Sequence, residues 1–378
     1  MKKIQKQYFF LKGRVALYTF LKALKLKKDD EIILPAFTCV VVANAIKYLD
    51  LKPIFLDIDP ITLQYDFQEL KNAINDETKA IICQNSFGYQ PYYNEFKYLK
   101  EEYPHIYFIE DAAHAYGVKS KNDDFLDAKF YSMQWSKMIT TGLGGILELR
   151  NGTLEKRIDD IYENELEELK TTKSTVLFLQ NYFYKYFITD NNYMFMKKVF
   201  QFLYTNNLMI GSSSKEELNM SMPQNYLVKY PKSLVHLFNL ETKKLSDNLK
   251  YRDRVSKIYF RLLKKYYLKL ELKDNFGLLT FPILFKDKKY VENLFLENSI
   301  RYGDWFVSPL HPLTMEEIDY KYFNYHKCEN SENICNHILN IPTNTKVGNI
   351  KKIIKIIKQL DREKQIIPWG SLEKLGEK

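Results

Sequence analysis

The sequence predicts an α/β fold in which helices flank a mostly parallel sheet, with a smaller α+β domain at the carboxyl end. Three observations predict it: short, continuously apolar segments recur through the first 150 residues, amphipathic helical patterns separate several of them, and the composition changes after Arg150. Uninterrupted apolar strands are typical of parallel sheets that are covered on both faces. Alternation of strands and helices is typical of open α/β sheets.

The elements of the first half follow from these patterns. Ligands of open α/β sheets bind beyond the carboxyl ends of the strands, so functional residues are expected at that edge. The predicted strands are 31–35, 53–58, 79–84, 106–111, 128–133 and 144–149, and the predicted helices are 15–26, 40–49, 66–75 and 94–103.

The second half begins with a helical segment at 151–232 that is rich in Lys and Glu and then in aromatic residues. A long amphipathic helix is predicted over 233–268, because leucines recur there at helical spacing. Strand-like segments at 278–285 and 337–342 and a final helix at 349–360 follow. We therefore predict a large domain over residues 1–235 and a small domain over residues 236–378.

Composition argues against several classes of protein. The 378 residues carry a net charge of +9, but only 8 of the 56 basic residues are Arg and the lysines are scattered, which does not favour nucleic-acid binding. The four Cys form no CxxC pair and the six His form no HExxH motif, so neither a disulfide framework nor a metal site is expected.

No segment is apolar enough to predict a membrane span or a targeting signal, so we expect a cytoplasmic protein. The aromatic stretch 178–204 comes closest to a span, but Lys185, Asp190, Lys197 and Lys198 interrupt it. It is compatible with helices that lie on a membrane surface, although burial or a subunit interface is the favoured interpretation.

The sharpest local signal lies between 128 and 149. Lys137 follows a predicted strand, and three of the 13 glycines, Gly142, Gly144 and Gly145, come soon after it. A Lys at the carboxyl edge of a sheet can lose its charge by desolvation and attack a carbonyl group as a nucleophile. Taken alone, however, Lys137 is more simply explained as an ordinary surface lysine.

A second signal lies at the end of the strand 106–111. Glu110 and Asp111 close that strand, and His114 follows within one helical turn. A carboxylate at this place suits a helix N-cap, or it suits the protonated ring nitrogen of pyridoxal 5'-phosphate (PLP). His114 is either a ligand of the same group or a hydrogen-bonded core histidine.

A third signal is Gly13 before a long predicted helix. Free N–H groups at a helix start bind phosphate, and Arg14 and Ser132 would add donors, although a plain helix start explains Gly13 as well.

Together these segments resemble the DegT/StrS-type sugar aminotransferases, which are PLP-dependent enzymes of fold type I. The resemblance runs from about Gly13 to Leu149 and continues more weakly to the end. Its motifs are GRVAL (13–17), DDEIILPAFTCVVVANAI (29–46), PIFLDIDP (53–60), NSFG (85–88), EDAAHA (110–115), YSMQWSKMITTGLGG (131–145) and ILNIP (338–342).

The resemblance implies roles for individual residues. Lys137 aligns with the lysine that binds PLP covalently, Asp111 with the partner of the pyridine nitrogen, and His114 with a residue on the hydroxyl side of the ring. The phosphate contacts would be Ser132 and the segment formed by Gly13, Arg14 and Val15.

Three positions depart from the family pattern. Cys39 stands where an aromatic residue stacks on the PLP ring, and Asn85 stands where His is common. Lys229, in KYPKS, stands where the neighbouring subunit usually contributes an Asn to the phosphate. The resemblance thereby implies a homodimer with sites at the subunit interface.

The implied activity is transfer of an amino group, from glutamate, to the keto group of a nucleotide-linked sugar in polysaccharide or glycan biosynthesis. A lysine at position 137 argues against the dehydration that is expected of relatives with His there. Another PLP reaction, a small keto phosphate as substrate, and a non-catalytic PLP-binding regulator remain open. The turn 301–312, with Asp304, Trp305 and His311, suits a substrate-facing loop or an aromatic cluster that caps the small domain.

Overall fold

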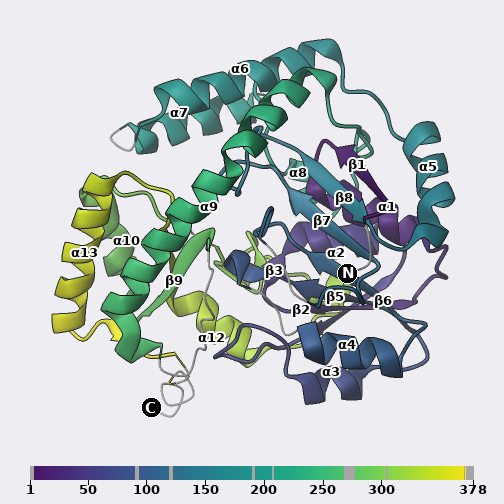
Figure 1. The fold of residues 1–378 in the computed structure, drawn as a ribbon, viewed down its shortest axis with the longest axis horizontal. Helices are drawn as coiled ribbons and strands as arrows, with labels where there is room; N and C mark the ends of the chain where they lie inside the picture. The colour runs from purple at the N-terminus through teal and green to yellow at the C-terminus, as the bar shows by residue number, and fades with distance from the viewer. Residues whose placement is uncertain are drawn as a thin grey trace.

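Two sheets organise the molecule. A seven-stranded sheet with helices on both faces forms one part, and a three-stranded sheet beside the long helix α9 (Val235–Leu263) forms the other (Figure 1). The computed structural model describes residues 4–89, 93–118, 122–189, 192–206, 208–267, 277–303, 305–369 and 371.

The large sheet has the strand order β1-β8-β7-β6-β5-β2-β4. Strands β4, β2, β5, β6 and β7 are parallel, β8 is antiparallel to β7, and β1 is antiparallel to β8. All six strands predicted from the apolar segments are present, which confirms the α/β fold. The strands are β1 (Lys6–Phe10), β2 (Glu31–Pro35), β4 (Lys52–Leu56), β5 (Thr78–Gln84), β6 (Tyr107–Asp111), β7 (Ala128–Ser132) and β8 (Gly145–Leu149).

Side chains alternate between two cores along these strands. Ile32 and Leu34 of β2 pack with helices α1 (Gly13–Ala23) and α2 (Val40–Lys47) on one face. Ile33 packs on the other face with α3 (Phe67–Ala73) and α4 (Tyr93–Glu102). Burial on both faces explains why these strands are continuously apolar.

The carboxyl-terminal region has the predicted α+β composition. Its three antiparallel strands have the order β11-β9-β12, and α9 contributes Val255 and Tyr259 to their hydrophobic core. The domain boundary near residue 235 stays a prediction, because Phe37 and Phe87 from the large part belong to the same core. The elements are β9 (Thr280–Phe285), α10 (Lys288–Glu297), β10 (Leu310–His311), α11 (Tyr320–Phe323), α12 (Glu329–His337), β11 (Ile338–Pro342), α13 (Val347–Arg362) and β12 (Ile366–Ile367).

Along the chain, the predicted helical segment comes between these two parts. It contains α5 (Glu155–Asn164), α6 (Thr171–Phe187), α7 (Tyr193–Thr205) and α8 (Lys215–Leu218). Helices α6 and α7 lie along the top edge of Figure 1, outside the sheet layers. Most of their aromatic side chains are exposed in the single chain, so they are not buried within it, and their place at a subunit interface stays a prediction.

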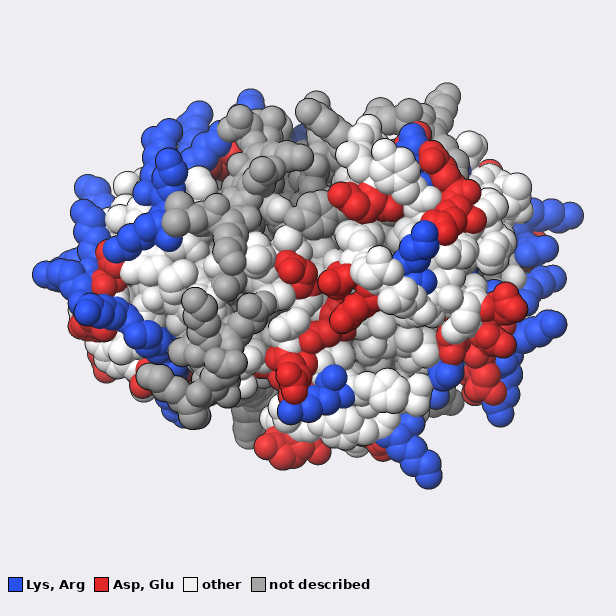
Figure 2. Space-filling view, turned by 90° about the horizontal axis from the view of Figure 1, so that it is seen from below, with Lys and Arg blue, Asp and Glu red and all other residues white. Residues whose placement is uncertain are grey.

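The surface carries charges of both signs. On the face opposite α6 and α7, acidic and basic residues are both present, with acidic ones near the centre of the view and basic ones toward its edges (Figure 2). Among the described residues, no helix has the length and apolar character needed to cross a membrane.

The start of α1 lies directly against the sheet. A β-carbon on Gly145 would lie 2.5 Å from backbone atoms of Gly13 and Lys12, and one on Gly13 would lie 2.8 Å from the carbonyl oxygen of Tyr131. Such distances are below any van der Waals contact, so both positions need glycine for the close approach of two backbones.

Replacing Gly145 should therefore destabilise the protein. We expect Gly145→Ala to lower the free energy of unfolding by about 1–3 kcal/mol, because backbone must move to make room for the methyl group. Gly348→Ala in α13 is the matched control: no atom lies within 4 Å of its new β-carbon, so stability should be unchanged or slightly higher. Urea unfolding of both variants measures the difference, and equal stabilities would contradict the packing argument.

Candidate active site

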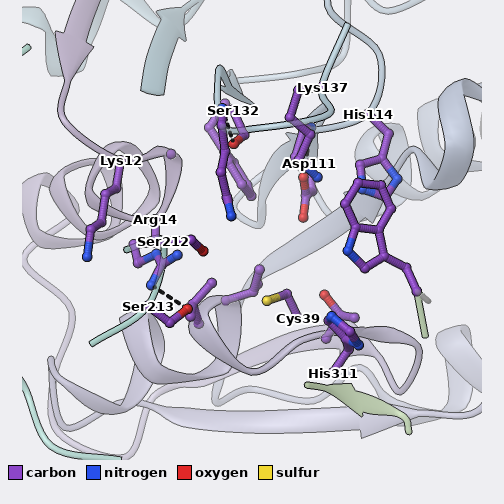
Figure 3. Close-up of a pocket in the computed structure, with 18 of the residues that line it drawn as sticks. Lys12, Arg14, Cys39, Asp111, His114, Ser132, Lys137, Ser212, Ser213 and His311 are labelled. Carbon is purple, nitrogen blue, oxygen red and sulfur yellow. Dashed lines mark hydrogen bonds between the residues drawn. The ribbon is translucent and has the colours of Figure 1, made fainter. Parts of the chain in front are cut away.

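A cavity of about 160 Å³ lies at the carboxyl ends of β5, β6 and β7. Cationic and hydroxyl side chains line one end of it, and Lys137, Asp111 and His114 line the other (Figure 3). The predicted residues that line it are Gly13, Arg14, Cys39, Asn85, Asp111, His114, Ser132, Lys137, Trp305 and His311.

Asp111 is buried, and Lys137 is half-buried. Burial lowers the pKa of Lys137 to about 8, although the carboxylate of Asp111 opposes that shift. Burial raises the pKa of Asp111 to about 6, against the effects of the Ala113 N–H group and the Lys137 charge. The cavity thus holds an amine that loses its proton far more readily than an ordinary lysine.

Asp111 does not cap a helix. Its Oδ1 accepts a hydrogen bond of 3.0 Å from the Ala113 N–H group, and residues 112–118 form turns rather than a helix. The helix N-cap interpretation of this carboxylate is therefore wrong, and its position at the cavity wall needs another explanation.

His114 is held as a neutral imidazole. Its Nδ1 accepts a hydrogen bond of 3.1 Å from the Phe87 N–H group, so the ring proton is on Nε2. Burial, followed by the nearby Lys137 charge, holds the pKa of His114 well below its ordinary value. His114 therefore offers one N–H donor at the wall of the cavity.

The turn that follows Gly303 contributes to two structures. The Trp305 ring stacks on His114 at 4.8 Å between centroids, and Lys137 Nζ lies 4.1 Å from the Trp305 ring centroid. Phe306 instead packs on Phe37, at 4.3 Å between ring centroids. Trp305 thus lies at the cavity and Phe306 in an aromatic cluster, and contact of this turn with a substrate stays a prediction.

A short parallel pairing brings this turn to the large sheet. Strand β10 pairs with β3 (Thr38–Cys39), so that His311 lies opposite Cys39. Both side chains line the cavity. Asp304 lies outside the described residues.

The cationic end of the cavity is built around a buried carboxylate. Glu217 accepts hydrogen bonds from Arg14 at 2.6 Å and from Lys12 at 3.0 Å, and Arg14 also donates to Ser213 Oγ at 3.4 Å. Burial alone would raise the pKa of Glu217, but the Arg14 and Lys12 charges keep it below its ordinary value. Burial, with the Arg14 charge, lowers the pKa of Lys12 to about 8.

Two predicted cofactor residues do not line this cavity. Val15 is fully buried in the core, and its N–H group donates to the Lys12 carbonyl oxygen. Lys229 pairs with Glu163 of the same chain at 2.9 Å and lies over the Tyr162 ring. Within one chain, then, neither side chain reaches the cavity.

Sequence reasoning missed Lys12, Ser212, Ser213 and Glu217. Lys12 directly precedes Gly13, so the start of α1 already pointed to it. A signal for Glu217 was also present: Ser214 and Glu217 form a capping box at the start of α8, which positions the carboxylate. The pairing of Glu217 with Arg14, 203 positions earlier, has no local signal.

Comparison with known proteins agrees with this geometry. Residues 11–181 match the model of the DegT/DnrJ/EryC1/StrS aminotransferase family. These residues are therefore similar to that family. The match contains Lys137, Asp111, His114 and Ser132, but not the segment with Glu217 or the turn with Trp305.

Curated relatives match over the same region. GDP-perosamine synthase of Escherichia coli O157:H7 is 36% identical over 148 residues, which cover 38% of this chain and 40% of that protein. L-Glutamine:2-deoxy-scyllo-inosose aminotransferase of Streptomyces lividus is 28% identical over 152 residues, covering 39% of this chain and 36% of that enzyme. The matched region thus spans about two fifths of the length of these relatives.

Solved structures extend the similarity in fold to nearly the whole chain. Helicobacter pylori PseC, an aminotransferase involved in the biosynthesis of pseudoaminic acid, superposes with a TM-score of 0.70 at 18% identity, over 94% of this chain and 86% of that one. GDP-4-keto-6-deoxy-D-mannose-3-dehydratase of E. coli superposes with a TM-score of 0.68 at 19% identity, over 93% and 87%. The carboxyl-terminal region therefore shares the fold of these proteins.

The buried carboxylate of Glu217 should be essential for stability. We expect Glu217→Gln to lower the free energy of unfolding by about 3 kcal/mol, because Arg14 and Lys12 would stay buried without their counter-charge. Inorganic phosphate should then restore more stability to the variant than it adds to the wild type. Glu216→Gln, at the exposed neighbouring position, is the control and should change stability by less than about 0.5 kcal/mol. Urea unfolding with and without phosphate measures both changes in stability. If phosphate raised the free energy of unfolding equally in all three proteins, the expectation that phosphate binds at the cationic end of the cavity would be contradicted.

Proposed function

We propose that this protein is a PLP-dependent aminotransferase that acts on a keto group of a nucleotide-linked sugar. One observation carries the proposal: a half-buried, easily deprotonated lysine and a buried carboxylate face one cavity, whose far end is lined by cationic and hydroxyl groups. The match of residues 11–181 to the DegT/DnrJ/EryC1/StrS aminotransferase family model supports the proposal.

The side chains present fit PLP. A phosphate group needs donors and positive charge, which Lys12, Arg14, Ser132 and Ser213 offer beside the free N–H groups at the start of α1. A protonated ring nitrogen needs a buried carboxylate, which Asp111 offers. Asn85 adds a buried Oδ1 atom without a hydrogen-bond partner in the described structure.

When bound, PLP supplies an electron sink for the bond electrons that are released at the carbon bearing the amino group. Asp111 keeps the ring nitrogen protonated, and this charge makes the sink effective. His114 would offer its Nε2 proton to the bound cofactor. Lys12, Arg14 and Ser132 bind the phosphate and fix the position of the ring relative to Lys137.

Lys137 performs the proton transfer. With PLP bound, its Nζ would anchor the cofactor and, once free, would serve as the base for the proton at the α-carbon of the amino donor. A base works best when its pKa lies near the working pH, and a pKa of about 8 meets this requirement. The same Nζ reverses the transfer when the keto substrate accepts the amino group.

The substrate class rests on the named relatives and on the turn after Gly303. GDP-perosamine synthases and L-glutamine:2-deoxy-scyllo-inosose aminotransferase match somewhat under two fifths of the chain, which favours a ring ketone. Trp305 and His311 line the open space near Lys137 and offer an apolar face and hydrogen bonds to such a ring. We propose glutamate as the amino donor, and surface polysaccharide or glycan biosynthesis in the cytoplasm as the setting.

The half-reaction with the donor tests the activity. Purified protein loaded with PLP should lose its yellow absorbance on addition of glutamate and release one equivalent of 2-oxoglutarate per site. Lys137→Ala should fold and bind PLP without this reaction, because the base and covalent anchor are gone. Asp111→Asn, which keeps the shape but removes the charge, should lower turnover at least about a hundredfold.

The same assay separates the alternatives. A PLP enzyme that decarboxylates or eliminates would form no 2-oxoglutarate, and a PLP-binding regulator would show no change of absorbance. Steady-state transamination by Lys137→Ala at the wild-type rate would refute the assignment of the base. The pyridoxamine form, offered a panel of keto-sugar nucleotides and small keto phosphates, would identify the acceptor.

We also propose that the active unit is a homodimer in which Lys229 serves the neighbouring site. Lys229 does not reach the cavity of its own chain, and the family resemblance assigns its position to the phosphate of the partner. Lys229→Ala should therefore weaken PLP retention. Mixed with Lys137→Ala, it should restore activity, because one site of the mixed dimer combines an intact Lys137 with an intact Lys229.

Sedimentation decides the first part of this proposal, and a fully active monomer would refute it. No recovery of activity, with mixed dimers shown to form, would mean that Lys229 has no role in the partner's site.

A further inference from the structure

Helix α6 packs against the rest of the protein with its polar face, whereas its sequence predicts that the apolar face is buried. Its buried positions include the polar residues Ser174, Gln180 and Asn181, whereas large apolar side chains are exposed. The exposed side chains recur at four-residue spacing and so form one stripe along the helix. They are Phe178, Leu179, Tyr182, Phe183, Tyr186 and Phe187.

Hydrogen bonds hold the polar face in place. Gln180 exchanges two hydrogen bonds with the backbone of Ile210, at 3.1 and 3.2 Å, and Ser174 Oγ bonds to Ser233 Oγ. Turning α6 over would break these bonds and bury unpaired polar groups elsewhere. The outward direction of the aromatic stripe is thus fixed by the body of the protein.

Helix α7 continues the pattern. Phe195 and Phe202, two turns apart, are 68% and 66% exposed, and none of the described side chains of α7 is fully buried. Helices α6 and α7 enclose a cavity of about 510 Å³, which aromatic and aliphatic side chains largely line. We call the exposed stripe of α6 together with Phe195 and Phe202 the aromatic surface. An apolar area of this extent marks a binding surface.

The charge of the segment that carries the aromatic surface is mainly positive. Residues 170–206 contain five Lys and a single acidic residue, Asp190. The lysines at 170, 173, 185, 197 and 198 are all exposed, and one of them, Lys185, pairs with Glu241 of α9. A partner that matches both features must be apolar within and negatively charged at its surface.

We propose that the aromatic surface docks the protein on an anionic lipid bilayer. Exposed Phe, Tyr and Leu side chains insert at the level of the lipid headgroups, and the surrounding lysines bind the negative lipids. A second copy of the chain fits less well, because a symmetric contact would place two lysine-rich segments against each other. Docking of this kind holds the helices on the surface of the bilayer, in agreement with the absence of a spanning helix among the described residues.

Co-sedimentation with vesicles tests the proposal. The full-length protein should bind vesicles of phosphatidylcholine with phosphatidylglycerol, bind weakly to phosphatidylcholine alone, and dissociate as salt is raised. Phe187→Ser/Phe195→Ser/Phe202→Ser should lower the partition coefficient at least about tenfold, because three apolar insertions are lost. Lys173→Glu/Lys198→Glu should lower binding to the anionic vesicles by a similar factor.

Matched controls make these changes specific. Tyr98→Ser/Tyr320→Ser/Val347→Ser removes three exposed apolar side chains elsewhere, and Lys351→Glu/Lys355→Glu reverses two exposed charges on α13. Both controls should bind vesicles like the wild type. Lys137→Ala should do so too, so that the outcome does not depend on the proposed enzymatic activity.

Three results would overturn the proposal. The first is no binding of the wild type to anionic vesicles at low salt, and the second is unchanged binding of the triple Phe variant. The third is a triple Phe variant that sediments without lipid as a smaller species than the wild type, since the aromatic surface would then be a contact between subunits.

Discussion

The contact between Gly13 and Gly145 supports both ends of the candidate site. Because neither residue has a side chain, the start of α1 can lie against the backbone of β7 and β8. That start carries Lys12 and Arg14 to one end of the cavity. The loop between β7 and β8 carries Lys137 to the other, so one backbone contact sets the separation of the anion-binding and amine groups.

The charged groups at the two ends of the cavity are subject to different dominant effects, ion pairing at one end and burial at the other. At the start of α1, Glu217 supplies a carboxylate to two cations, and Arg14 keeps its charge although it is buried. At the other end, burial dominates: it moves the pKa of Lys137 down and that of Asp111 up. The neutral His114 and the Trp305 ring add no charge there. One end is therefore prepared to bind an anion, and the other to exchange a proton.

Much of this arrangement could be predicted from the sequence, because it depends on local pattern and on one topological rule. The apolar segments defined the six strands, and the rule that parallel strands present their carboxyl ends at one edge brought Asp111, Ser132 and Lys137 together. Strand β1 was not expected, since KQYFF (6–10) is short and follows a basic start. Its pairing with β8 depends on tertiary packing rather than on its own residues.

Contacts between distant segments could not be predicted. The bond from Phe87 to Nδ1 of His114, the pairing of β3 with β10, and the ion pair of Arg14 with Glu217 join residues 27 to 272 positions apart. No spacing rule reports such pairs. The periodicity of the sequence also could not decide which face of α6 points inward. It shows that apolar residues form a stripe along the helix, but not what covers that stripe.

The orientation of α6 links the surface of the protein to the loop that carries Lys137. Trp135, two residues before Lys137, packs against Tyr184 of α6 at 4.7 Å between ring centroids. Trp135 and Ser136 also form part of the wall of the cavity that α6 and α7 enclose. The segment that presents Lys137 is thus held by the sheet on one side and by α6 on the other. A partner that binds the aromatic surface would therefore contact a helix that packs against the loop of Lys137. A displacement of α6 on binding would reach Lys137 through the packing of Trp135 on Tyr184.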